Sequence, residues 1–331
     1  MFLGSNNRME TTVIPALGYP FIPMPIAGFR GLSVATLTLP LQILQSVRIA
    51  YAAIKRHRPH AVLVAGAYVS YPAGIAAGLA GVPLIVMESN LNPGKTNARL
   101  AKKAAALVVA FPESKNFFPP EVQPRIHVLG NPVRGQILDT PSIADARQSL
   151  GLKPDVPTVF VVGGSLGAQS INTAIEQSLH HIADAPYQVL WQTGRSYSSQ
   201  INVPENVVRI PYVESMGSAF VAADLVVSRS GATTIAELGI VGRAAVLVPL
   251  PSASTNEQQH NANVVAKNGG AVVVQDADLR TELLPTINRL MHDDEQRNTM
   301  LQAMKHLGKP TAAADVARLV LSCGGWTGGE Q

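Results

Sequence analysis

Short runs of aliphatic residues alternate along the chain with longer stretches of helical character. In the first half the helical stretches lie around residues 41–57, 73–80 and 96–104. Runs without polar interruption are typical of parallel strands, because helices cover both faces of their sheet. The strands predicted in this way are 20–25, 61–65, 84–87, 106–110, 126–129, 158–162, 188–192, 207–210, 224–228, 245–248 and 271–274. The pattern predicts an α/β protein with two doubly wound, Rossmann-like domains.

A proline-rich stretch separates the two sets of strands. Residues 130–157 contain four prolines around a polar middle, and prolines interrupt regular structure. We interpret residues 134–157 as a hinge between a first domain, 1–133, and a second domain, 158–331. Open α/β sheets bind ligands outside the carboxyl ends of their strands. We therefore expect the two domains to face a cleft that holds the site.

Residues 61–87 carry no charge and are numerous enough to cross a membrane. The run contains two prolines and four glycines, however, and an internal segment of small residues separates two aliphatic ones. A strand, a helix and a second strand explain this composition better than a membrane span. Residues 1–4 (MFLG) do not resemble the beginning of a signal peptide. We therefore expect a cytoplasmic protein.

The composition narrows the class of protein. Hydrophobic residues make up 47% of the chain, which excludes wholesale disorder. The net charge of +4 is too weak to imply a nucleic-acid partner. The one cysteine, Cys323, has no partner for an internal disulfide, and no Cys/His cluster has the spacing of a zinc site. We expect a reducing compartment, no structural metal, and a frayed tail from Cys323 through the glycines 324, 325, 328 and 329.

Two turns in the second half have the composition of a nucleotide site. Residues 163–168 (GGSLGA) follow one predicted strand, and residues 228–234 (SRSGATT) follow another, with Glu237 one turn further on. Glycine lets a backbone approach a phosphate closely, and a helix N-terminus offers free N–H groups. Glu237 could accept hydrogen bonds from ribose hydroxyls. A packing turn and an ordinary capped helix are the alternatives, but the occurrence of both turns favours a nucleotide.

Three further stretches carry candidate chemistry. The neutral run 258–263 (QQHNAN) suits recognition of a sugar, with a solvated loop as the alternative. In the first half, Glu88 ends a strand, where it could act as a base, bind hydroxyls or simply cap the strand. The uncharged residues 31–47 lead into Arg48 and the basic run 55–58. An apolar surface with a basic rim suits anionic lipid headgroups, and a core helix with a solvated basic end is the alternative.

Taken in order, these motifs resemble the MurG family of peptidoglycan N-acetylglucosaminyltransferases. The matching motifs are GFRG at 28–31, AYVS at 67–70, ESN at 88–90, GNPVR at 130–134, GGSLGA at 163–168, RSGA at 229–232 and Gln258. The resemblance covers essentially the whole chain. It implies a GT-B fold and an inverting transfer of N-acetylglucosamine from UDP-N-acetylglucosamine to undecaprenyl-diphosphate-muramoyl-pentapeptide, which converts lipid I to lipid II. It also implies a peripheral protein at the cytoplasmic face of the membrane, with no cofactor.

The resemblance assigns roles to individual positions. It places Ala67, Tyr68 and Ser70 in a loop that faces the acceptor, and it leaves Glu88 as the candidate catalytic base. The residues that it assigns to the UDP-sugar are Asn90, Arg134, Ser165, Val213, Ala232, Thr233, Thr234, Ile235, Ala236, Glu237 and Gln258.

The chain departs from the family pattern in two places. Met87 and Ser89 stand where the family usually has His and Gln. The family's opening glycine-rich turn, which ends in His, has no counterpart, so we expect a start assigned too far downstream or a fragment, with poor activity. A catalytically silent UDP-sugar-binding protein is the alternative from another class. A UDP-N-acetylglucosamine 2-epimerase on the same fold is a further alternative. The apolar residues 31–47 and the basic run 55–58 argue against it, because they suit a lipid surface.

Overall fold

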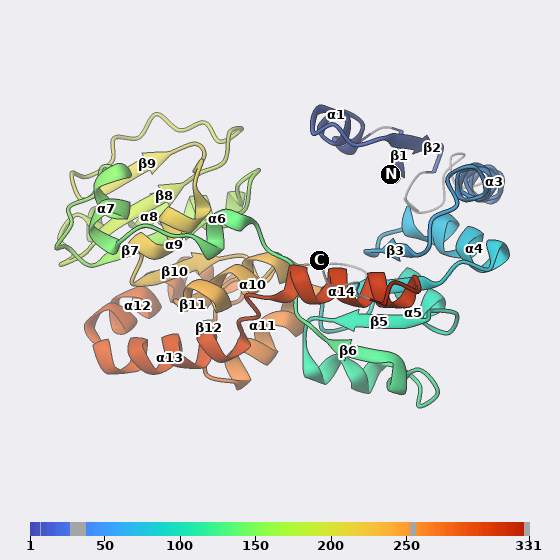
Figure 1. Ribbon diagram of the computed structural model, residues 1–331. Helices are drawn as coiled ribbons and strands as arrows, with labels where there is room; N and C mark the ends of the chain where they lie inside the picture. Colours follow the sequence, from blue (N-terminus) through green and yellow to red (C-terminus); the bar gives the residue numbers. More distant parts are fainter. Residues whose placement is uncertain (7, 27–37, 252–255, 328–331) are drawn as a thin grey trace. The chain divides into compact units, whose positions relative to one another are not determined.

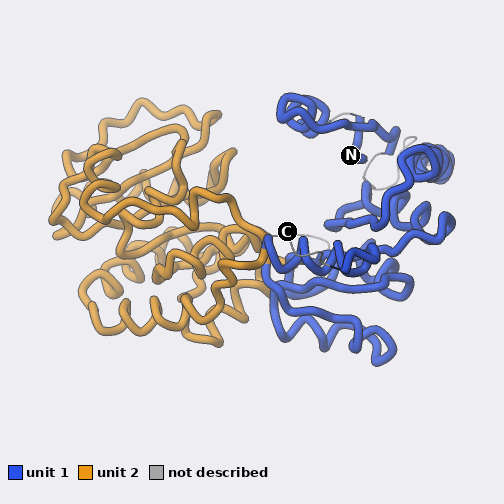
Figure 2. The backbone as a smooth tube through the Cα atoms, viewed as in Figure 1, with its two compact units in different colours: residues 1–130, 313–331 blue, residues 131–312 orange. Residues whose placement is uncertain are grey.

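The computed structural model describes residues 1–6, 8–26, 38–251 and 256–327. The chain forms two compact units (Figure 2). Unit 1 consists of residues 1–130 and 313–331, and unit 2 consists of residues 131–312. The motif at 28–31 and the first part of the apolar stretch 31–47 lie outside the described residues.

The described part of unit 1 contains two parallel sheets (Figure 1). The first pairs β1 (Phe2–Ser5) with β2 (Phe21–Met24), and the second has the order β3 (Val62–Val64), β4 (Leu84–Glu88), β5 (Ala106–Val109) and β6 (Ile126–Val128). The α-helices are α1 (Glu10–Ala16), α3 (Leu39–His57), α4 (Ser70–Ala80), α5 (Lys95–Ala101) and α14 (Ala312–Cys323), and the 3-10 helices are η1 (Pro112–Phe117) and η2 (Gln123–Arg125).

Residues 61–87 fold as strand, helix and strand, as predicted. Small residues on α4 allow close packing, since a Cβ at Gly74 would lie 2.6 Å from Leu100 Cδ2. Ala76 and Ala77 of the same helix are fully buried. No described helix is both long enough and apolar enough to cross a bilayer. The uncharged run is therefore a packed βαβ core, because its glycines and alanines serve close helix packing.

Unit 2 is built on one parallel sheet of six strands. Its order is β12 (Ala271–Val273), β11 (Ala244–Leu247), β10 (Leu225–Ser228), β7 (Thr158–Val162), β8 (Gln188–Gln192) and β9 (Val207–Ile210). The α-helices are α6 (Gly135–Leu138), α7 (Ile143–Ser149), α8 (Gln169–Ile182), α9 (Met216–Ala222), α10 (Ala232–Val241), α11 (Glu257–Lys267), α12 (Leu279–His292) and α13 (Asp294–Leu307), and η3 is a 3-10 helix (Asp276–Asp278).

The strand order of unit 2 defines where a ligand can bind. The chain starts at β7, proceeds outward through β8 and β9, and then returns to the other side of β7 with β10. Helices α8 and α12 contribute to the core on one face of the sheet, and Phe220 of α9 packs edge-on against Phe160 on the other. The reversal between β7 and β10 is a topological switch point, where the turns after the two strands diverge.

The unit boundaries differ from the predicted domains at two places. The predicted hinge, 134–157, contains α6 and α7 and belongs to unit 2, whereas residues 313–331 belong to unit 1. The second difference arises because Val316 of α14 packs with Ile85 and Val108 of the unit 1 sheet. Cys323 is the last residue of α14 rather than part of a frayed tail.

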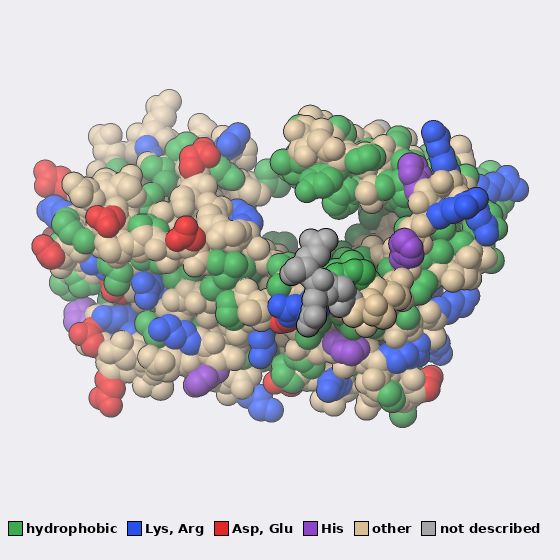
Figure 3. Space-filling model, in the orientation of Figure 1, with side chains coloured by type: hydrophobic (Ala, Val, Ile, Leu, Met, Phe, Trp, Pro, Cys, Tyr) green, Lys and Arg blue, Asp and Glu red, His purple; other side chains and the backbone are tan. Residues whose placement is uncertain are grey.

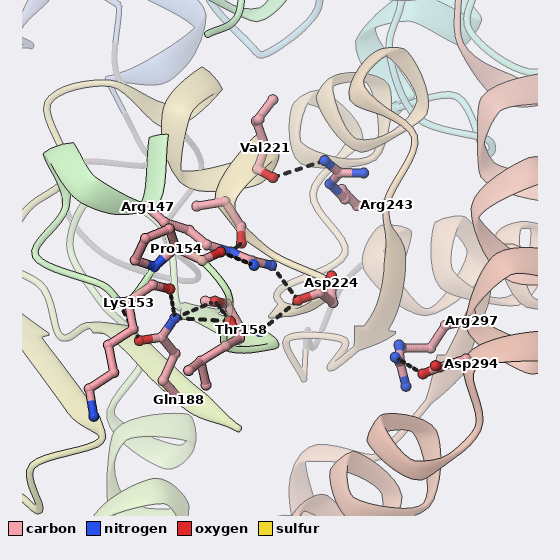
Figure 4. Close-up of polar contacts among 12 residues, drawn as sticks. Arg147, Lys153, Pro154, Thr158, Gln188, Val221, Asp224, Arg243, Asp294 and Arg297 are labelled. Atoms are coloured by element: carbon pink, nitrogen blue, oxygen red, sulfur yellow. Dashed lines mark hydrogen bonds and ion pairs between the residues drawn. The ribbon is translucent and has the colours of Figure 1, made fainter. Parts of the chain in front are cut away.

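Buried polar contacts fix the predicted hinge to the sheet of unit 2 (Figure 4). Arg147 is 7% exposed, and its guanidinium donates to the Ala222 carbonyl at 2.9 Å, the Pro154 carbonyl at 2.7 Å and Asp224 Oδ2 at 2.7 Å. The same Asp224 oxygen accepts the Thr158 N–H at 2.6 Å. Residues 147–154 are therefore anchored at the amino end of β7, which explains why they do not behave as a separate linker.

We expect Asp224→Ala to destabilise unit 2 by about 3 kcal/mol, because it leaves the buried Arg147 charge without its carboxylate. Urea unfolding followed by circular dichroism measures the change. Asp294→Ala is the matched control, since it removes a carboxylate that is 82% exposed from its pair with Arg297 (Figure 4) and should cost less than about 1 kcal/mol. Equal losses in the two variants would contradict the anchoring role of Asp224.

Candidate functional site

A pocket of about 800 Å³ lies in unit 2 at the carboxyl ends of β7 and β10. It is therefore at the switch point of the sheet. Among the residues assigned to the UDP-sugar from the sequence, those that line it are Arg134, Ser165, Val213, Thr233, Thr234, Glu237 and Gln258. The structure thus brings together the two glycine-containing turns and the hydrogen-bonding side chains that the sequence analysis considered separately.

The turn after β7 is packed so closely that its glycines are required. Gly167 has φ +80°, and a Cβ there would lie 2.0 Å from the Thr193 carbonyl oxygen. Gly194 has φ +91°, and a Cβ there would lie 2.4 Å from the Leu166 carbonyl oxygen. The turn leads directly into α8, a helix of 14 residues. This arrangement presents backbone N–H groups and a helix N-terminus, which together favour a phosphate.

Glu237 and Arg134 form an ion pair in the pocket. Arg134 Nε and Nη2 both lie 2.9 Å from Glu237 Oε1. The Glu237 side chain is 2% exposed, whereas that of Arg134 is 50% exposed. Burial raises the pKa of Glu237, and Arg134 offsets part of this effect. Oε2 makes none of these contacts with Arg134, so the carboxylate keeps capacity to accept hydrogen bonds from a ligand.

Arg229 joins several strand ends on one side of the pocket. Its guanidinium pairs with Asp276 after β12 and donates to Ser170 Oγ at 2.8 Å in the first turn of α8. It also donates to the carbonyls of Val248 and Pro249 at 3.3 Å, after β11. Arg229 therefore fixes the geometry around the second glycine-containing turn, and its charge is balanced by Asp276.

The polar run 258–263 is helical rather than a solvated loop. It lies in α11, and Gln258 is the one residue of the run among the described residues that line the pocket. Gln258 Oε1 accepts the Leu250 N–H at 3.0 Å, and its carbonyl accepts from Ser230 Oγ at 2.8 Å. Asn261 is fully buried in the helix. Gln258 thus connects the turn after β10 to the turn after β11.

Some assigned residues do not line this pocket. Ala232 and Ile235 are buried in α10, and Ala236 of the same helix is half-buried away from the pocket lining. Asn90 belongs to unit 1. Sequence reasoning missed other lining residues, among which are Gln169, Ser170, Gln192, Tyr212, Met216, Leu250 and Asp276. Gln192 could have been found, because it ends a predicted strand beside the glycine turn.

Glu88 of unit 1 is held by four hydrogen bonds and is 4% exposed. Oε1 accepts from the Asn90 N–H at 2.9 Å and from Asn90 Nδ2 at 3.4 Å. Oε2 accepts from the Gly94 N–H at 3.0 Å and from Asn97 Nδ2 at 2.8 Å. A general base needs a lone pair directed at its substrate. The contacts of Glu88 favour a role in shaping the loop 88–97.

The loop predicted to face the acceptor lies next to that carboxylate. A Cβ at Gly66 would lie 3.3 Å from Asn97 Nδ2, so the turns after β3 and β4 adjoin. Ser70 Oγ donates to the Gly66 carbonyl. Ala67 has φ +58°, a left-handed conformation that is strained for an alanine. The strain marks this loop as a place where backbone geometry is constrained.

We expect Ala67→Gly to raise the free energy of unfolding of the chain by about 0.5–1 kcal/mol, since glycine adopts a positive φ without the steric cost of a Cβ. Thermal unfolding measures the change. Ala80→Gly is the control, because Ala80 lies in α4 and glycine should destabilise a helix. Destabilisation by both substitutions would show that the conformation of Ala67 costs little.

Basic side chains gather over α3 in unit 1 (Figure 3). Lys55, Arg56 and His57 occupy its last turn. Leu41 is 69% exposed and Leu44 is 49% exposed near its beginning. The described part of the stretch 31–58 thus combines exposed leucines with basic residues on one helix.

Comparison with known proteins agrees with this arrangement. The family model "Glycosyltransferase family 28 N-terminal domain" matches residues 1–109, and the model "Glycosyltransferase family 28 C-terminal domain" matches residues 158–316. A "UDP-N-acetylglucosamine--N-acetylmuramyl-(pentapeptide) pyrophosphoryl-undecaprenol N-acetylglucosamine transferase" from Parabacteroides distasonis is 35% identical over 321 residues, which are 95% of this chain and 86% of the relative. The protein of the same name from Cytophaga hutchinsonii is 35% identical over 324 residues, 97% of this chain and 87% of the relative.

Solved structures support the same assignment. MurG from Acinetobacter baumannii has a TM-score of 0.78 and 28% identity, with 97% of this chain and 90% of that chain covered. The calicheamicin glycosyltransferase CalG4 has a TM-score of 0.65 at 16% identity, with 97% and 90% covered, which shows the fold alone. The predicted α/β, GT-B-like fold class is confirmed. The chain belongs to glycosyltransferase family 28 and, within it, to the MurG family.

Proposed function

We propose that this chain transfers N-acetylglucosamine from UDP-N-acetylglucosamine to undecaprenyl-diphosphate-muramoyl-pentapeptide, converting lipid I to lipid II. The observation that carries the proposal is the pocket at the switch point of unit 2, where a glycine turn, a helix N-terminus and a buried carboxylate meet. Membership of the MurG family, whose relatives carry this activity in their names, favours a transferase over a 2-epimerase.

The pocket provides complementary groups for each part of the donor. Backbone N–H groups in the turn 163–168 and at the start of α8 would receive the diphosphate. Glu237 would accept hydrogen bonds from the ribose hydroxyls, and the half-exposed Arg134 would contribute positive charge. Gln258, Thr233 and Thr234 line the same pocket and offer neutral donors and acceptors to the sugar.

The reaction proceeds by direct displacement in this proposal. The acceptor hydroxyl oxygen forms a bond to the anomeric carbon on the face opposite to UDP, and the bond from that carbon to the diphosphate oxygen breaks. The electron pair leaves with UDP, where the N–H groups and Arg134 stabilise the charge. The hydroxyl proton passes to a base. The hydrogen bonds of Glu88 lead us to assign it to the positioning of Asn90 and not to this proton transfer.

A transfer assay tests the proposal. Labelled N-acetylglucosamine is presented as UDP-sugar together with a soluble lipid-linked muramoyl-pentapeptide analogue, and the labelled product is separated by chromatography. The proposal predicts labelled disaccharide and release of UDP in equal amounts. Binding of UDP-N-acetylglucosamine without transfer would favour the silent binding protein. Epimerised donor without transfer would favour the epimerase.

We further propose that unit 1 binds an anionic membrane surface peripherally through α3. The exposed leucines would enter the interface, while Lys55 and Arg56 attract lipid phosphates. The chain should sediment with anionic vesicles at low salt and be partly released at high salt, because salt screens the attraction. The double variant Lys55→Gln/Arg56→Gln should bind less at low salt. If the chain binds neutral vesicles as well as anionic ones, and independently of salt, electrostatic attraction does not contribute to membrane binding.

A further inference from the structure

Gln192 joins two turns that both belong to the pocket. It is the last residue of β8, which lies between β7 and β9, and it is 1% exposed. Its Nε2 donates to the Gly164 carbonyl at 2.9 Å, in the turn after β7. Its Oε1 accepts the Val213 N–H at 3.1 Å, in the turn after β9. One buried amide group at the end of β8 therefore connects the turn after β7 to the turn after β9.

The strand end around Gln192 is itself held rigidly. Asn172 Nδ2 donates to the Thr193 carbonyl at 2.7 Å, and Asn172 Oδ1 accepts from Trp191 Nε1 at 3.0 Å. The Thr193 carbonyl also contacts the turn at Gly167. Because its flanking residues are fixed in this way, the Gln192 side chain holds Gly164 and Val213 at a defined distance from each other.

The chemistry of the two contacts requires an amide. Gly164 supplies an acceptor and Val213 supplies a donor, so the side chain between them must donate and accept at once. A glutamine does this in its neutral form, whereas an ionised glutamate only accepts. A carboxylate at this position would place an oxygen without a proton against the Gly164 carbonyl oxygen, and a buried charged group that loses a hydrogen-bond partner is unfavourable.

We propose that Gln192 is a positioning residue for the nucleotide donor, and this inference rests on the proposed function. It sets the spacing between the turn that receives the diphosphate and Val213, which lines the same pocket. Gln192 itself takes no part in bond making. Its loss should therefore raise the KM for the donor and leave kcat at saturating donor nearly unchanged.

Gln192→Glu tests the proposal through the pH dependence of binding. Titration calorimetry with UDP-N-acetylglucosamine should show an affinity of Gln192→Glu that is about 10- to 100-fold weaker than that of the unmodified chain at pH 8. The ionised glutamate loses the hydrogen bond to the Gly164 carbonyl and places a buried negative charge beside it. At lower pH a protonated glutamate can donate to the Gly164 carbonyl as the amide does. The dissociation constant of Gln192→Glu divided by that of the unmodified chain should therefore fall towards 1 as the pH falls. Gln192→Met should weaken binding without any such recovery, and it serves if the glutamate variant does not fold.

Gln188→Glu is the matched control. Gln188 lies at the other end of β8 and is 4% exposed, and its amide also donates and accepts, with Lys153 and Thr158 as partners (Figure 4). This variant should lose stability but keep donor affinity. If Gln188→Glu and Gln192→Glu weaken donor binding equally, the positioning role of Gln192 is wrong, while the proposed function stands. The same holds if the loss of affinity in Gln192→Glu does not change with pH. An unmodified chain that does not bind the donor would overturn the proposed function and this inference with it.

Discussion

Replacing Gly167 by alanine is expected to reduce the affinity for UDP-N-acetylglucosamine by about 100-fold, because it displaces the turn that we assign to the diphosphate, and a misplacement of about 1 Å in an enzyme site reduces the reaction rate by about that factor. The added Cβ would lie 2.0 Å from the Thr193 carbonyl oxygen, and both groups are backbone or directly attached to it. Since neither can rotate away, the turn 163–168 must move. Titration calorimetry measures the affinity, and thermal unfolding measures the accompanying loss of stability.

Gly151→Ala is the control for this prediction. Gly151 has φ +73°, so alanine suffers the same kind of backbone strain there, but a Cβ at Gly151 meets no atom within 4 Å and Gly151 does not line the pocket. Strain alone should destabilise the chain by about 1–2 kcal/mol and leave most of the donor affinity. If both variants bind the donor equally well, the turn does not hold the diphosphate.

Replacing Glu237 by glutamine is expected to weaken donor binding at neutral pH by about 10- to 100-fold, as when a buried hydrogen-bonding group loses its charge. The carboxylate is the acceptor that we assign to the ribose hydroxyls. In the unmodified chain, burial raises the pKa of Glu237. Affinity for UDP-N-acetylglucosamine should therefore fall as the pH is lowered through that raised pKa, and Glu237→Gln should lose this dependence. Calorimetry across a pH series measures both.

The same pKa shift predicts an opposite effect on stability. A raised pKa means that the folded state binds the proton more tightly than the unfolded state. Ionised Glu237 therefore costs stability as the pH rises from the usual range of a glutamate through the raised pKa, and the cost is absent below that range. Glu237→Gln should be at least as stable as the unmodified chain near neutral pH. A variant that loses both stability and affinity would show that Glu237 serves the fold through Arg134 instead.

The sequence predicted most strands because their signal is local. The runs 158–162 and 188–192 each have at least three consecutive apolar residues, and both became interior strands of the unit 2 sheet. The helix at Ile143–Ser149 was not predicted, since it is short and partly polar. The return of α14 to unit 1 depends on the packing of Val316 against residues more than 200 positions earlier, which no local pattern records.

The candidate site was predictable to a similar extent. Glycine composition indicated the two turns, and the family resemblance added Arg134 and Val213 at positions whose local sequence gives no signal. Residue type could not reveal that Glu88 is enclosed by Asn90, Gly94 and Asn97. It also could not reveal the bridge made by Gln192, because hydrogen bonds between neighbouring turns depend on strand order.

The most direct test of the central claim is a crystal structure of the full chain with UDP-N-acetylglucosamine bound. The account predicts the nucleotide in the pocket of unit 2, with its diphosphate within hydrogen-bond distance of backbone N–H groups in the turn 163–168. It also predicts the ribose hydroxyls within hydrogen-bond distance of the Glu237 carboxylate. A nucleotide bound elsewhere on the chain, or this pocket empty at saturating donor, would contradict the account.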